Sequence, residues 1–416
     1  MASSSSVPLS LPILDLSLAN DPAQRPALLA QLHDALFNVG FLYIKNHGVD
    51  ALTIKNLTEK LPALFALPSD VKAGLSKLNS PHFLGYSGFA EETTLGKKDL
   101  REQFDFATEL PVVYHDSESA PSLTDGSSTR GTHSGSRDFS SLYWRLRGPN
   151  QWPPEDLLPG FRQAFIAYHD AVQALSYRFV HLVEEAFNIP TGTFDHFFRA
   201  PDFRAPSAVA SITHNNSTFQ PSDLPPQHRI KLLKYPPSAS PAAGDTAAQG
   251  VGAHKDSSGW LTFLLQVGQE AGLEVLAADD ETWIPATPVD GTFVVNFGNA
   301  FEAATEGAVR ATVHRVRAPA PTSPPRYSIP FFQGLPLDMT VSQVRSYIPE
   351  AVRELRRERC GDGANGVSSF LDPRWDALGE SQLRKWIRSH EDVGRKWYGH
   401  AVVEYYLSRV RRNGDM

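Results

Sequence analysis

Between residues 230 and 332 the sequence consists of short apolar runs separated by Gly, Pro, Asp and Asn. Runs of this length, bounded by turn-forming residues, predict β-strands. Six are expected: Ile230–Tyr235, Trp260–Val267, Leu273–Leu276, Thr292–Phe297, Ala311–Val316 and Tyr327–Phe332. Six short strands within about a hundred residues indicate a β-sandwich or barrel, so this region constrains the fold more than any other.

Helical patterns surround the β region. A helix is expected from about Pro22 to Val39, where Gly40 ends it, followed by a strand at Phe41–Lys45. Further helices are expected at Asp50–Phe65, Ser69–Leu78, Val341–Glu358 and Gln382–Arg412. The clearest helix is Phe161–Phe187, because its apolar residues recur at steps of three and four: Phe161, Phe165, Tyr168, Val172, Leu175, Phe179, Leu182 and Ala186. That stripe predicts a helix packed on the core.

Composition excludes several classes of protein. The 416 residues include 39 Lys+Arg and 46 Asp+Glu, a net charge of −7, and no basic block of the kind that binds nucleic acid or an anionic membrane. Because the sequence shows neither the pattern of a signal peptide nor an apolar run long enough for a membrane-spanning helix, we expect a cytoplasmic protein without membrane or nucleic-acid partners. A single cysteine, Cys360, excludes an internal disulfide and a Cys-based metal cluster, which leaves 14 histidines as candidate ligands.

Two residues of the β region can present metal ligands together. In an extended strand, residues i and i+2 face the same way, so His254 and Asp256 are expected to point into one interior. His314, 58 residues after Asp256, can supply a third ligand from another strand. Two histidines and one carboxylate form the facial triad that binds Fe(II) and leaves coordination positions open. A second His-x-Asp, His390 to Asp392, lies in a helical stretch, where we expect no metal site.

A second motif indicates an anion beside this triad. Arg326-Tyr327-Ser328 is the only Arg-x-Ser in the chain and begins a strand 12 residues after His314. Strand alternation places Arg326 and Ser328 on one face, where a guanidinium and a hydroxyl can bind one carboxylate. Alone, the motif is more simply explained by an arginine at a sheet edge. Together with the triad, it predicts an iron centre with a carboxylate-bearing co-substrate.

The ordered set of motifs resembles the Fe(II)- and 2-oxoglutarate-dependent oxygenases, in the branch that includes isopenicillin N synthase and the plant flavonoid and gibberellin oxygenases. The matching stretches cover most of the chain: Pro12–Asp15, Gly40–Gly48, Arg101–Phe106, Leu233–Pro237, Val295–Asn299 and the strand around His314. The chain departs from the family pattern at Leu233, where Asn is common, and by one extra residue before Leu261. A long loop from Ser238 to Gly250 precedes the first iron ligand.

The resemblance implies a role for six side chains. Three would bind Fe(II): His254, Asp256 and His314. Three would hold the distal carboxylate of 2-oxoglutarate: Arg326, Ser328 and Tyr235. It further implies O2 as oxidant, ascorbate as a supporting reductant, and hydroxylation, desaturation or ring closure of a small organic substrate with release of succinate and CO2. Four residues are candidates for the substrate pocket: His214, Phe104, Phe106 and Phe332. For the three phenylalanines, packing in the core is the simpler explanation, although positions of this kind can serve both purposes.

The predicted fold class is mixed α/β with a mainly β core, a double-stranded β-helix (jelly roll) with an N-terminal α/β lobe and C-terminal helices. We expect the lobe at 1–114, a mobile Ser/Gly/Thr-rich insertion at 115–138, a linking segment with the long core helix at 139–199, the jelly-roll Fe(II)/2-oxoglutarate core at 200–337 and a helical extension at 338–416. A monomer is favoured.

Three other functions remain open on the sequence. An oxidase of the isopenicillin N synthase type would use the iron without 2-oxoglutarate, since Arg326 and Ser328 can equally bind a substrate carboxylate. A catalytically silent ligand-binding protein could use the same scaffold, although the complete ligand set argues against it. A zinc hydrolase is disfavoured because no residue near the triad reads as the general base.

Overall fold

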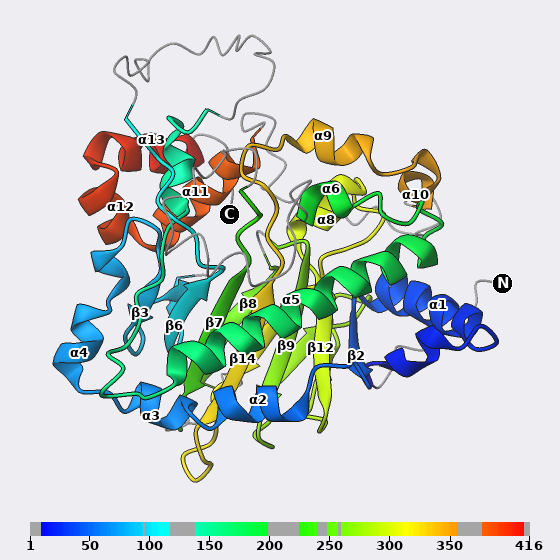
Figure 1. Cartoon of the computed structure of the whole chain (residues 1–416), viewed down its shortest axis with the longest axis horizontal. Coiled ribbons are helices and arrows are strands. Elements are labelled where there is room, and N and C mark those ends of the chain that lie inside the picture. Colours follow the sequence, from blue (N-terminus) through cyan, green and yellow to red (C-terminus); the bar gives the residue numbers. More distant parts are fainter. Residues whose placement is uncertain are drawn as a thin grey trace.

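Two β-sheets form the centre of the computed structural model, which describes residues 10–94, 96–116, 138–198, 224–238, 248–256, 259–355 and 377–411 (Figure 1). The larger sheet contains β1 (Ile13–Asp15), β2 (Phe41–Lys45), β3 (Gly85–Ser87), β6 (Glu102–Ala107), β7 (Arg229–Tyr235), β9 (Leu261–Val267), β12 (Thr292–Phe297) and β14 (Arg326–Phe332). The smaller sheet contains β8 (Gln249–His254), β10 (Leu273–Leu276), β11 (Trp283–Pro285) and β13 (His314–Arg317). A separate hairpin pairs β4 (Thr93–Thr94) with β5 (Lys97–Lys98).

The strand order shows how the chain builds these sheets. The larger sheet runs β1-β2-β12-β9-β14-β7-β6-β3 and is antiparallel except where β1 pairs with β2. The smaller runs β11-β10-β13-β8 and is antiparallel throughout. Two mostly antiparallel sheets flanked by helices confirm the predicted jelly-roll core with helical parts. The N-terminal region contributes β1, β2, β3 and β6 to the same sheet as the later strands.

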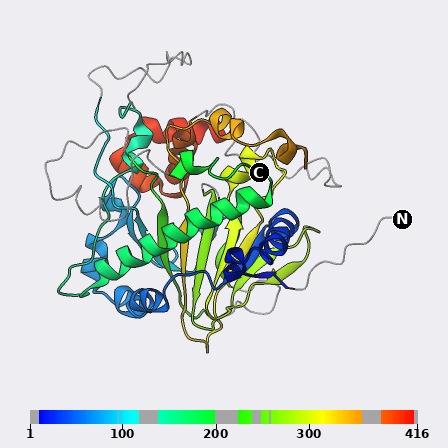
Figure 2. The same ribbon diagram turned by 45° about the vertical axis from the view of Figure 1, so that its right-hand side comes forward.

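Helices surround the sheets. They are α1 (Arg25–Asp34), α2 (Ala51–Thr58), α3 (Leu61–Phe65), α4 (Ser69–Gly74), α5 (Phe161–Ala186), α6 (Asp195–Phe198), α8 (Asn299–Ala304), α9 (Val341–Ser346), α10 (Glu350–Glu354), α11 (Leu378–Ser389), α12 (Glu391–Trp397) and α13 (His400–Arg411). The long helix α5 crosses one face of the larger sheet in both ribbon views (Figures 1 and 2). The C-terminal helices α11 to α13, in red, gather at one end of the molecule beside β3 and β6 (Figure 1).

The core lies between α5 and the larger sheet. The predicted stripe of α5 is buried from Phe161 to Leu182, and its rings pack on the strands. Phe165 lies 4.8 Å from Phe106 of β6, and Phe179 lies 5.6 Å from Phe263 of β9, measured between ring centroids. The sequence periodicity therefore identified the face of the helix that buries the apolar side of the sheet.

Several expected helices are shorter than predicted. Val341–Glu358 contains α9 and α10, because Pro349 cannot continue a helix, and Gln382–Arg412 is divided at His390 and at Gly399, whose φ is +90°. Asp50–Phe65 is likewise divided into α2 and α3. Pro22–Val39 becomes α1 followed by one π-helical turn, which Gly40 ends with φ of +75°. The predicted insertion at 115–138 lies almost wholly outside the described residues.

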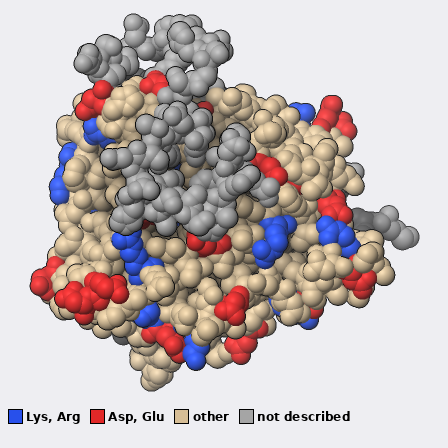
Figure 3. Space-filling model, in the orientation of Figure 1, with Lys and Arg blue, Asp and Glu red and all other residues tan. Residues whose placement is uncertain are grey.

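Charge on the surface is mixed. On the face seen in Figure 3, the coloured Lys and Arg side chains alternate with Asp and Glu, and neither sign forms a large patch. Within the described segments, no helix combines the length and apolarity needed to cross a bilayer.

Replacing Phe179 with Ala should destabilise the fold by about 3–5 kcal/mol, because a large buried ring leaves a cavity between α5 and β9. The midpoint of urea unfolding measures the loss. Ile166→Ala, on the same helix but 39% exposed, is the matched control and should cost much less. Equal losses for the two variants would contradict the assignment of the core face.

Candidate metal centre

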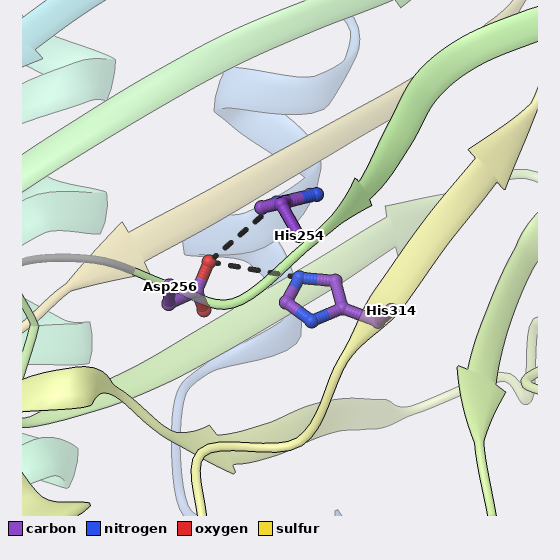
Figure 4. Close-up of side chains that lie close together, drawn as sticks. All are labelled: His254, Asp256 and His314. Atoms are coloured by element: carbon purple, nitrogen blue, oxygen red, sulfur yellow. Dashed lines mark ion pairs between the residues drawn. The ribbon is translucent and has the colours of Figure 1, made fainter. Parts of the chain in front are cut away.

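Three candidate ligands converge where the smaller sheet meets the cavity between the sheets. One ligand atom from each of His254, Asp256 and His314 lies within 4.8 Å of the others, and Figure 4 shows the three side chains pointing toward one another. Asp256 Oδ1 lies 3.9 Å from His254 Nε2 and 3.6 Å from His314 Nε2. No other group of at least three His, Cys, Asp or Glu side chains in the described part of the chain has this spacing. The three residues therefore form a pocket of donor atoms sized for one cation.

The backbone brings the ligands together differently from the sequence-based expectation. His254 and His314 are cross-strand partners of β8 and β13, with ring centroids 4.3 Å apart. Asp256, however, lies beyond the end of β8, so strand alternation does not orient it. Its carbonyl instead accepts a hydrogen bond from the Asn299 N–H (2.7 Å) at the start of α8. The residues were predicted to meet, but the reason given for Asp256 was wrong.

Backbone carbonyls orient both imidazoles. Nδ1 of His254 lies 2.8 Å from the Gly252 carbonyl, and Nδ1 of His314 lies 3.1 Å from the Thr312 carbonyl. A carbonyl oxygen only accepts, so each Nδ1 carries a proton, and in the neutral imidazole Nε2 is the atom free to bind a metal. This is the arrangement by which proteins fix the tautomer of a metal-binding histidine.

Two side chains of the larger sheet hold the Asp256 carboxylate. Thr262 Oγ1 donates to Asp256 Oδ2 (2.7 Å) from β9, and Asn296 Nδ2 donates to the same oxygen (2.8 Å) from β12. Oδ1 is left facing the histidines. Burial opposes the charge of Asp256, but His314, His254 and the Asn296 amide keep its pKa below the usual range, so the carboxylate stays ionised.

The surroundings of the site shift the pKa values of the two histidines in opposite directions. Burial and the adjacent His314 lower the pKa of His254 to about 3, which keeps its imidazole neutral and able to bind a metal. For His314, burial also disfavours the charged form, but the Asp256 carboxylate outweighs it and raises the pKa. A cation between the three groups would take the place of the proton that His314 otherwise holds beside Asp256.

A buried arginine stands at another part of the same cavity. Arg326 is 1% exposed, and its guanidinium donates to Gln266 Oε1 (2.9 Å) and Ser328 Oγ (3.4 Å), while Nε has no hydrogen-bond partner. No carboxylate among the described residues pairs with it within 4 Å. Tyr235 lies beside it, with the ring centroid 5.1 Å from the guanidinium carbon. An arginine buried with only neutral partners fits an anion that arrives from outside the chain.

Both groups line one cavity of about 550 Å³, large enough for a small organic molecule. Its wall includes the three candidate ligands, the predicted anion-binding residues Arg326, Ser328 and Tyr235, and Phe332. Phe104 and Phe106 do not line it. They point from β6 into the core against Phe65 and Phe165, because strand alternation turns Gln103 and Asp105 to the opposite side. The pocket role predicted for these two rings is thus corrected, and His214 lies outside the described residues.

Sequence reasoning missed the residues that support the ligands. Thr262 and Asn296 orient Asp256, and Gln266 accepts from Arg326, yet each is an ordinary polar residue within a strand. Arg229 and Lys231 also line the cavity. The sequence could have indicated them, because Arg229 and Lys231 lie at alternate positions from Tyr235 on β7 and therefore share its face of the strand.

The two other histidine motifs have structural surroundings. His47, expected to be structural, is buried, accepts from the Val49 N–H through Nδ1 and packs against Phe293. His390, in the second His-x-Asp, lies between α11 and α12 with Nε2 2.9 Å from Glu92 Oε1. Asp392 is exposed at the start of α12.

Comparisons with known proteins match both the fold and this site. Residues 11–155 match the family model for the non-haem dioxygenase in morphine synthesis N-terminal region, and residues 226–334 match that of the 2OG-Fe(II) oxygenase superfamily. The 2-oxoglutarate-dependent dioxygenase frbJ of Dothideomycetidae sp. is 37% identical over 93% of this chain and 92% of its own. A 2-oxoglutarate-dependent dioxygenase of Gibberella zeae is 29% identical over 94% and 91%.

A solved structure shares the fold. The full-length Neurospora crassa protein in complex with alpha-KG and thymine superposes with a TM-score of 0.57 and 21% identity, over 84% of this chain and 97% of that chain. At this identity the likeness concerns the fold alone.

Thr262→Val removes one of the two side-chain donors to Asp256 with little change of shape. We expect metal affinity to fall roughly 10- to 100-fold, as is typical for residues that orient a ligand. Anaerobic titration with Fe(II) measures it. Thr53→Val, at a half-buried position on α2, is the control and should leave the affinity unchanged. An unchanged affinity for Thr262→Val would show that the threonine does not position the carboxylate.

Proposed function

Because this chain belongs to the 2OG-Fe(II) oxygenase superfamily, and is accordingly a Fe(II)- and 2-oxoglutarate-dependent dioxygenase, we propose that His254, Asp256 and His314 hold its iron. One observation carries the proposal: two imidazoles and one ionised carboxylate converge on a single point of the cavity wall. The imidazole of His254 is held neutral there, as a metal ligand must be. Their donor set is that of the non-haem iron facial triad.

The distal carboxylate of 2-oxoglutarate is assigned to Arg326, Ser328 and Tyr235. Support comes from the buried guanidinium, which has an unpartnered Nε and only neutral hydrogen-bond partners. Burial lowers the pKa of Arg326 from its usual value and outweighs the opposing effects of Tyr235 and Glu270, as expected for a buried cation without an ion pair. A bound carboxylate would supply that partner through charge-assisted hydrogen bonds.

When bound, Fe(II) and 2-oxoglutarate activate O2 so that oxidation of the substrate is coupled to loss of CO2 and formation of succinate. The protein contributes the orientation of these groups. Thr262 and Asn296 hold Asp256 in place, the Gly252 and Thr312 carbonyls hold the imidazoles, and Gln266 holds the guanidinium of Arg326. The cavity that these groups share accommodates a small-molecule substrate.

Asp256→Ala should abolish iron binding and succinate formation, by more than about 100-fold, because it removes a ligand rather than a supporting residue. Anaerobic addition of Fe(II) and 2-oxoglutarate should give the weak visible band of their chelate in the wild type and none in the variant. Asp392→Ala, in the second His-x-Asp, is the matched control and should retain the band. A retained band in Asp256→Ala would exclude this iron site. Substrate oxidation by the wild type without succinate would favour an oxidase of the isopenicillin N synthase type.

Arg326→Gln should raise the 2-oxoglutarate concentration for half-maximal turnover roughly 10- to 150-fold, the equivalent of one charge-assisted hydrogen bond. Fe(II) affinity should stay close to that of the wild type. Arg317→Gln, at a position on β13 whose side chain is 46% exposed, controls for loss of a positive charge. An unchanged 2-oxoglutarate requirement would remove Arg326 from the co-substrate site.

A further inference from the structure

The cavity has a second basic region, formed by Arg101, Arg229, Lys231 and Lys385, which we call the basic wall. Arg229 and Lys231 reach it from β7, on the face that also carries Tyr235, and Lys385 reaches it from α11. On β7 the two ends face different partners, since Tyr235 pairs with Arg326 and Arg229 pairs with Phe332. Six residues of strand separate these ends by roughly 20 Å, so one small dicarboxylate cannot reach from Arg326 to Arg229.

Two members of the basic wall have carboxylate partners. Arg101 lies 2.8 Å from Glu92 and 3.7 Å from Asp99, and Lys231 lies 3.5 Å from Asp105 and 3.9 Å from Glu92. The same carboxylates are shared with a third cation, Lys77, which lies 2.8 Å from Glu92 and 2.7 Å from Asp105 and is 2% exposed. The available negative charge is therefore already divided among three cations.

The other two members have no carboxylate partner within 4 Å among the described residues. Arg229 donates only to the carbonyls of His82, Phe83 and Leu146, and its guanidinium carbon lies 4.3 Å from the centre of the Trp386 ring. Lys385 makes no hydrogen bond or ion pair within the part of the chain that the structure describes, although it is partly buried and lines the cavity. Burying a cation that has no anionic partner costs free energy, and binding an anion would offset that cost.

The excess of positive over negative side chains also favours a bound anion. Around this part of the cavity five cations (Lys77 and the basic wall) face three carboxylates: Glu92, Asp99 and Asp105. Burial and the neighbouring Lys231 lower the pKa of Lys385 to about 8, and burial lowers that of Arg229 to about 10. Asp256 opposes the shift of Lys385, so this amine lies within electrostatic reach of the candidate iron ligands.

We propose that the substrate of this dioxygenase is an organic acid whose anionic group binds Lys385 and Arg229, while the remainder of the molecule extends along the cavity toward His254 and Asp256. The proposal rests on the iron and 2-oxoglutarate sites assigned above, because those sites define where oxidation occurs. Charge at the basic wall then selects acids over neutral molecules of the same shape, and Trp386 beside Arg229 offers an aromatic surface to the adjoining apolar part.

Calorimetric titration of the anaerobic Fe(II)–2-oxoglutarate complex tests this, since Arg326 is then occupied. The probes are phenylacetate, 4-phenylbutanoate and octanoate, each beside its primary amide. The wild type should bind at least one acid roughly 10- to 100-fold more tightly than its amide. Lys385→Met should lose that preference and Lys385→Arg should keep most of it, while Lys55→Met, at a position on α2 whose side chain is 64% exposed, should behave as the wild type.

The outcomes separate the two proposals. The visible band of the Fe(II)–2-oxoglutarate chelate is recorded before each titration, and its absence would defeat the proposed function itself. With the band present, acids that bind no better than their amides, whether both bind or neither does, contradict the organic-acid substrate. A preference for acids that persists in Lys385→Met would place the anion elsewhere and overturn the role of this lysine.

Discussion

The Asp256 carboxylate is the contact on which the two sheets depend. It follows β8 of the smaller sheet, faces His254 and His314 of that sheet with one oxygen, and accepts from Thr262 and Asn296 of the larger sheet with the other. A buried carboxylate without partners costs several kcal/mol, so any shift of one sheet relative to the other would be penalised here. The geometry of the ligands and the packing of the two sheets are thus one constraint.

A second group of buried charges fixes the C-terminal helices over the cavity. His390 Nε2, between α11 and α12, lies 2.9 Å from Glu92, which also pairs with Lys77, and the Tyr398 hydroxyl donates to the Pro81 carbonyl (2.8 Å). These contacts join helices from the end of the chain to the segment before β6. They position α11, and hence Lys385 and Trp386, through residues outside the strands that carry the candidate ligands.

Sequence alone predicted seven of the strands that the structure describes, the long helix α5 and the candidate residues for the iron and 2-oxoglutarate sites, because each follows a local period or a spaced motif. It did not predict β1, β3, β6, β8 or β11, which are short or contain few apolar residues at alternate positions. It could not place Thr262 and Asn296, since a carboxylate's partners depend on which strands become neighbours. For the same reason it left Phe104 and Phe106 as candidates for both the core and the pocket, because alternation fixes that two rings share a face but not which side of the sheet that face meets. The predicted ends of the later helices were wrong where single residues, Pro349 and Gly399, interrupt an otherwise continuous helical pattern.

The position of α11 has a consequence for how such a protein can diversify. The candidate ligands lie on β8 and β13 or just beyond, whereas Lys385 and Trp386 belong to a stretch that follows the last strand of the sheets. Under the proposed role of Lys385, substitutions in that stretch change the choice of substrate without altering the candidate iron ligands. Only the part of the proposed acid site on α11 has this freedom, since Arg229 lies on β7 of the larger sheet.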